Sequence, residues 1–91
     1  MRRPKQILIF GKTIPIEYVS EFEDEATEGM FQSHPLKIMI LDNDNWSSRL
    51  THEAVHAALE ISGVGQALGD AMEEAVTKCL ENALSPYLRF K

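Results

Sequence analysis

Hydrophobic and polar residues alternate in the first part of the chain and recur at helical spacing in the second part. Two β-rich runs, residues 6–10 and 13–19, are separated by Gly11 and Lys12. Glycine at the first central turn position predicts a type II′ β-hairpin between them. A third strand is predicted over residues 35–42, where the apolar run in PLKIMILD indicates partial burial on both faces.

Two helices are predicted after these strands. The first begins at Ser47 or Ser48, either of which can act as N-cap, and runs to Ile61, with Gly63 as its C-terminal stop. The second begins near Asp70 and carries a stripe of apolar residues at helical spacing. We therefore expect an α+β fold in which a three-stranded, mostly antiparallel sheet packs on two helices, as a single domain of residues 1–91.

Composition and charge argue against nucleic acid and membranes as partners of this protein. The formal charge of −5 argues against nucleic acid as a partner, because phosphate contacts require clustered Lys and Arg. No stretch approaches the roughly 18 apolar residues of a membrane span, so we expect no membrane partner and a cytoplasmic location. The single cysteine, Cys79, lies in the apolar stripe, where burial as a small hydrophobe is predicted. The acidic run at 17–28 is predicted to be a solvated connection.

The sequence HEAVH at positions 52–56 is the strongest chemical signal. Residues four apart lie on one face of a helix, so His52 and His56 can direct two imidazole nitrogens at one point, as a zinc site requires. Glu53, rotated by about 100° from His52, is placed to act on a zinc-bound water as general base. Composition alone gives roughly 0.01 chance matches to this pattern in a chain of this length, so coincidence is a poor explanation.

A catalytic zinc of this type needs a third protein ligand, and the second predicted helix offers Glu73 and Glu74. Glu73 has the spacing of a capping box with Asp70, which is a sufficient structural role. Glu74 has no such role and lies opposite the apolar stripe. We prefer Glu74 as the third metal ligand, with Glu73 as the alternative.

The arrangement of HExxH followed by a glutamate on a later helix resembles the gluzincin metallopeptidases. More narrowly, the chain resembles the small zinc metallopeptidases encoded by phages and prophages. In those proteins a hairpin, an acidic loop and a strand precede the HExxH helix, and the last helix ends in a motif like EAVTKCLENAL, which here spans Glu74 to Leu84. The resemblance implies a zincin-like fold, Zn²⁺ held by His52, His56 and Glu74, and Glu53 as the general base, in a phage-type protein that acts inside its host cell.

The resemblance implies that the substrate is a peptide or protein. Two further expectations concern how the substrate is aligned and how the oxyanion is stabilised. In zincin folds a sheet edge aligns an extended substrate, and the resemblance would give the strand at 37–42 that task. No residue matches the position of the Tyr or His that stabilises the oxyanion in gluzincins, although His34, Tyr18 and Tyr87 are available.

The predicted function is therefore that of a zinc metallopeptidase. The alternative is a non-catalytic interaction protein whose metal stabilises a small fold, a phage-type accessory or regulatory factor, with residues 17–28 as its binding surface.

Overall fold

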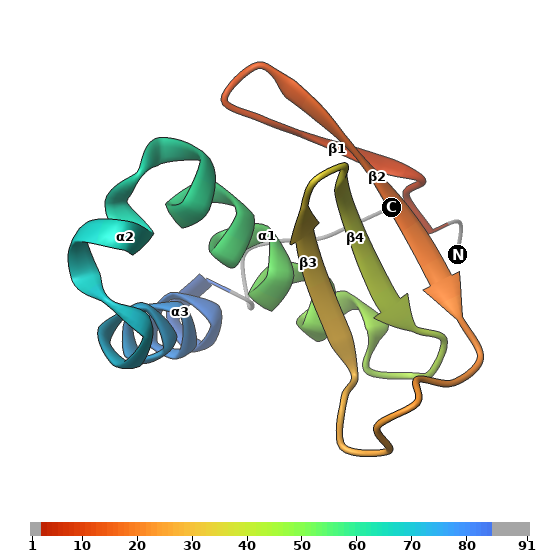
Figure 1. Ribbon diagram of the computed structural model, residues 1–91. Helices are drawn as coiled ribbons and strands as arrows, with labels where there is room; N and C mark the ends of the chain where they lie inside the picture. The colour runs from red at the N-terminus through yellow and green to blue at the C-terminus, as the bar shows by residue number, and fades with distance from the viewer. Residues whose placement is uncertain (1–2, 85–91) are drawn as a thin grey trace.

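The computed structural model describes residues 3–84 as four strands followed by three helices (Figure 1). The elements are β1 (Gln6–Ile9), β2 (Lys12–Val19), β3 (Gly29–Ser33), β4 (Leu36–Leu41), α1 (Trp46–Ser62), α2 (Val64–Leu68) and α3 (Asp70–Leu84). The α+β class is confirmed. None of these helices is long and apolar enough to cross a membrane.

The strands form one mixed sheet in the order β1-β2-β4-β3, which corrects the predicted number of three strands, while two of the three pairings are antiparallel. β1 pairs antiparallel with β2, and β3 pairs antiparallel with β4. β2 and β4 are parallel, because β3 lies between them in sequence and reverses the chain before β4 inserts beside β2. The strand that the prediction lacked is β3, directly after the acidic run.

The hairpin turn differs from the predicted one. Its two central residues are Phe10 and Gly11, with φ angles of 49° and 75°, and Ile9 pairs with Lys12 across it. Two consecutive positive φ values are the requirement of a type I′ turn, so the type II′ prediction centred on Gly11 and Lys12 is wrong. The type I′ turn matches the twist of the two strands, although it holds a phenylalanine in a left-handed conformation.

The expectation that residues 37–42 provide a free sheet edge is also wrong. β4 pairs with β2 on one side and with β3 on the other, so its backbone groups are used within the sheet. Among residues 3–84, the edge strand beside the helices is β3, which pairs there only with β4.

The core lies between one face of the sheet and α1 (Figure 1). Alternate residues of β2 and β4 point to this face, as the two-residue period of a strand requires. The buried apolar residues are Ile14, Ile16, Ile38, Ile40, Trp46, Leu50 and Ala57.

The first helix ends as predicted but begins earlier. Gly63 adopts the left-handed conformation (φ 83°) that closes α1. The helix starts at Trp46 after an N-cap at Asn45, so Ser47 and Ser48 lie inside its first turn. Trp46 is buried and packs edge-on against the ring of Tyr18, which allows the helix to begin before the serines.

The last helix packs against α1 with its polar face. Thr77 is fully buried, whereas Met72 is 54% exposed and Cys79 is exposed, so the predicted burial of Cys79 is wrong. The face of α1 that α3 meets carries His52 and His56, and these polar side chains are matched by glutamates rather than by the apolar stripe. The short helix α2, which the prediction lacked, joins the two.

Candidate metal centre

The two histidines of the HEAVH segment lie one turn apart on α1 and face α3. Both Nε2 atoms are directed at the Glu74 carboxylate, at 3.3 Å for His52 and 3.2 Å for His56. The three side chains offer ligand atoms that all lie within 4.8 Å of one another and could hold a metal ion. The structure therefore brings together the three residues that the sequence predicted as ligands, with Glu74 rather than Glu73 in the third position.

The other nitrogen of each imidazole also faces a carboxylate. His52 Nδ1 lies 2.6 Å from Glu81 Oε2, and Ser48 Oγ donates a hydrogen bond of 3.2 Å to Glu81 Oε1. His56 Nδ1 lies 3.6 Å from Glu73 Oε2. Ser48 meets Glu81 while His56 meets Glu73, so α1 and α3 run antiparallel across this site.

Each histidine ring thus has a carboxylate on the side of each of its two nitrogens. A neutral imidazole has a single N–H and can donate to one carboxylate only. If His52 Nδ1 donates to Glu81, its Nε2 is unprotonated and can bind a metal, which is the usual outer-shell arrangement of metal-binding histidines. The two Nε2 atoms lie 3.3 and 3.2 Å from different oxygens of the Glu74 carboxylate, and one ligand atom from each of the three residues lies within 4.8 Å of the others. The donor set could therefore hold a metal ion.

Glu53 is almost completely buried, with 5% of its surface exposed. Burial raises the pKa of its carboxyl group above the usual value, although His56 and Arg49 partly oppose this rise. Arg49 Nη1 lies 3.9 Å from Glu53 Oε2, and its Nη2 donates to Glu28 at 3.2 Å. A carboxylate with a raised proton affinity suits a general base.

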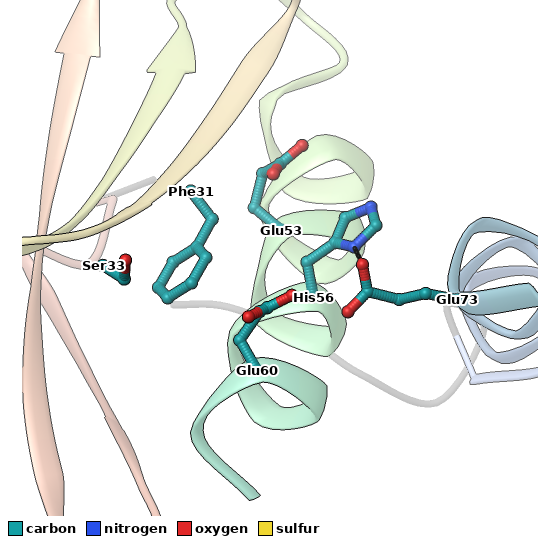
Figure 2. A pocket seen from close by; sticks show the side chains of 6 residues that line it. All are labelled: Phe31, Ser33, Glu53, His56, Glu60 and Glu73. Atoms are coloured by element: carbon teal, nitrogen blue, oxygen red, sulfur yellow. Dashed lines mark ion pairs between the residues drawn. The ribbon is translucent and has the colours of Figure 1, made fainter. Parts of the chain in front are cut away.

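A pocket of about 320 Å³ opens beside this group, between β3 on one side and α1 and α3 on the other (Figure 2). Its lining residues are Phe31, Ser33, Glu53, His56, Glu60 and Glu73. The predicted base and one predicted ligand therefore lie on the wall of the same pocket. A second pocket of about 340 Å³ shares Phe31, Ser33 and Glu60 with it and continues to His34 and Gln66.

Glu73 has a different role from the predicted capping box. Its carboxylate points to His56, as the dashed line in Figure 2 marks, and lies near Glu60. Burial, followed by the neighbouring Glu60 carboxyl, raises the pKa of Glu73. Gly65 makes room for this side chain, since a Cβ at that position would collide with Glu73 Oε1.

The sequence analysis missed the roles of Glu81 and Glu73 and the contribution of β3. Glu81 follows Glu74 by seven residues, two helical turns, so it lies on the same face of α3. This spacing was the available signal for a second carboxylate facing the HEAVH helix. The approach of Phe31 and Ser33 to the pocket depends on the position of β3 in the sheet and had no signal in the sequence.

The candidate oxyanion donors are not gathered at the metal ligands. The Tyr18 hydroxyl donates to the Pro4 carbonyl at 2.7 Å, and its ring packs on Trp46. His34 is exposed and lines the second pocket. Tyr87 lies outside the described residues.

Comparison of the chain with protein-family models, with curated proteins and with solved structures found no match. A function for this chain is therefore argued from its own residues.

Proposed function

We propose that this protein is a zinc-dependent metallopeptidase. The observation that carries the proposal is the convergence of His52 Nε2, His56 Nε2 and the Glu74 carboxylate, beside a pocket that the buried Glu53 also lines. Zinc is favoured over magnesium or calcium because two of the three ligands are imidazole nitrogens, whereas the hard cations prefer oxygen. When bound, zinc would polarise the substrate carbonyl and make the attacking water more acidic.

In this proposal each residue of the chain has a defined task. His52, His56 and Glu74 hold the metal. Glu53 accepts the proton of the attacking water and passes it to the leaving amine, and its burial increases its affinity for that proton. The pocket between β3 and α1 holds the peptide.

We infer that β3, rather than β4, aligns an extended substrate. Within the described part of the chain β3 pairs on one side only, and its Phe31 and Ser33 line both pockets. Strand addition uses backbone hydrogen bonds and needs no particular side chains. A cleaved peptide should therefore lose affinity when backbone nitrogens on either side of the scissile bond are methylated. A KM that does not change on methylation would argue against this alignment.

The decisive experiment combines metal analysis with one substitution. The protein purified without added metal should contain about one zinc per chain by elemental analysis. Glu53→Gln keeps the shape of the side chain but removes the base, so it should retain the zinc and the melting temperature while peptide turnover falls by at least about 100-fold. A zinc-loaded protein whose turnover is unchanged by Glu53→Gln would contradict the assigned mechanism.

The alternative function, a metal-stabilised interaction protein, gives a different result in the same experiment. It requires the zinc but predicts no peptide turnover in either form, and no loss of partner binding on Glu53→Gln.

A further inference from the structure

The face of the sheet opposite α1 carries an apolar patch on the neighbouring strands β3 and β4. Ile38 and Ile40 of β4 are buried toward α1, so Met39 between them points to the opposite face. Met30 of β3 is its direct partner in the antiparallel register and is 42% exposed. In Figure 1 α1 lies behind β3 and β4, whereas α2 and α3 lie beside the sheet, next to β3.

The connection between β2 and β3, residues 20–28, turns this patch into a groove. Phe22 of this loop is half-buried and, together with Val19, joins the two methionines in lining a cavity of about 470 Å³. The remaining lining residues are Glu21, Glu23, Asp24 and Thr27. The volume lies in the range of functional binding pockets, and the cavity shares no residue with the pocket beside the metal centre.

The charges around this groove are negative and unbalanced. Within the acidic run at 17–28, the first and last members are neutralised by the fold: Glu17 pairs with Lys37 at 3.0 Å and Glu28 with Arg49 at 3.2 Å. In the part of the chain that the structure describes, the four acids between them make no ion pair. These residues are Glu21, Glu23, Asp24 and Glu25. Three of the four line the groove.

We propose that this groove is the docking site for a basic amphipathic segment of another protein, one in which Lys or Arg flanks a large apolar side chain. The apolar side chain would enter the cavity lined by Phe22, Met30 and Met39, and the cations would face the acidic rim. Methionine side chains adapt to differently shaped apolar groups, which suits a peptide partner. The same rim repels the phosphates of nucleic acids and of anionic membranes. The site is independent of the metal centre and is not needed for peptide hydrolysis.

The test uses a synthetic peptide of Lys and Leu with one central Trp, titrated into the zinc-loaded Glu53→Gln variant so that cleavage cannot interfere. The methyl NMR signals of Met30 and Met39 should shift and saturate, while that of Met72 on α3, which is also exposed, stays in place. Raising the salt from about 0.05 M to about 0.5 M should weaken binding, because exposed charges are screened. A matched peptide with Glu in place of Lys should give no shift.

Two pairs of variants locate the site. Met30→Ala should weaken peptide binding by at least about fivefold, and Met72→Ala should change it by less than about twofold. The Glu21→Gln, Glu23→Gln double variant should weaken binding and reduce its salt dependence, whereas Glu25→Gln, on the same loop but outside the cavity lining, should have a smaller effect. The proposal is overturned by equal binding of the Glu peptide, by shifts centred on Met72, or by Met30 and Met39 shifts that follow protein concentration alone and so report a second copy.

Discussion

At the scale of single residues, the carboxylate that faces each imidazole nitrogen decides which nitrogen can bind a metal. His52 and His56 each present Nε2 to Glu74 and Nδ1 to a second carboxylate. If the His52 ring donates its Nδ1 proton to Glu81, its Nε2 is unprotonated, which is the form that binds a metal. The chain thus orients its own ligands without a contribution from the metal.

Glu81 is the clearest test of this orientation. Its carboxylate lies 2.6 Å from His52 Nδ1 and is held by Ser48. Because outer-shell carboxylates typically contribute 10- to 100-fold to metal affinity, Glu81→Gln should weaken zinc binding by about that factor while the fold is retained. Competition with a chromogenic chelator measures the affinity. In the same assay Glu74→Gln should weaken binding more than Glu81→Gln, and the exposed Glu25→Gln should have no effect. An affinity unchanged by Glu81→Gln would show that the contact does not orient His52.

At the scale of elements, the packing of β3 against α1 depends on a glycine. Gly29 begins β3, and a Cβ added there would lie 2.6 Å from Arg49 Cγ and 3.1 Å from Glu53 Cγ. The strand can therefore approach the HEAVH helix at this point only without a side chain.

Gly29→Ala should destabilise the protein by about 1–3 kcal/mol, the usual cost of overpacking a filled site. Urea unfolding measures the loss. The cost should be smaller in an Arg49→Ala background, where the colliding side chain is absent, so a double-mutant cycle reports the coupling between the two positions. If Gly29→Ala lowers the free energy of unfolding equally in both backgrounds, the destabilisation does not come from a collision with Arg49. Displacement of Arg49 also removes its 3.9 Å contact with Glu53, which would raise the pKa of the Glu53 carboxyl further.

The packing of α3 is the second feature of this scale. Its contacts with α1 include histidine–glutamate pairs, while Met72, Cys79 and Leu80 are exposed. None of the side chains described for α3, residues 70–83, belongs to the apolar core cluster, which comes from the sheet and α1. The attachment of α3 therefore depends on polar interactions that a bound cation would strengthen.

At the scale of the whole molecule, metal and stability should be linked. The chain has 91 residues, and residues 3–83 contribute seven buried apolar side chains to the core, so an additional cross-link between α1 and α3 is a large fraction of its stability. With free zinc at about 100 times Kd, binding to the folded state alone contributes about 2.7 kcal/mol. Chelation should then lower Tm by at least about 10 °C for a domain of this size.

Circular dichroism with and without a chelator measures this shift. Chelation should lower the Tm of the Glu53→Gln variant as much as that of the unmodified protein, because Glu53 is not a ligand in the proposed site. Glu74→Gln should have a low Tm that the chelator does not change. A melting temperature that is independent of chelation in the unmodified protein would exclude a metal that stabilises the fold.

The sequence by itself determined the local features of this protein. The β-rich runs at residues 13–19 and 35–42, the helical spacing after Trp46 and the stop at Gly63 depend on near neighbours in the chain, and they appear in the structure. The same holds for the alignment of His52 and His56, because residues four apart share a helix face whatever surrounds them. The choice of Glu74 was predicted because Glu73 had the spacing of a capping box and Glu74 had no structural role, and from the family resemblance.

Only the tertiary structure decided how these local features combine. The insertion of β4 between β2 and β3, which makes β3 the free edge, depends on contacts between strands far apart in sequence. The exposure of Cys79 depends on which face of α3 meets α1. An apolar stripe predicts burial, but the histidines of the opposing helix select the glutamate face instead, since buried polar groups require polar partners. The ligand set could thus be predicted residue by residue, whereas the carboxylates behind it and the pocket beside it exist only where α1, α3 and β3 meet.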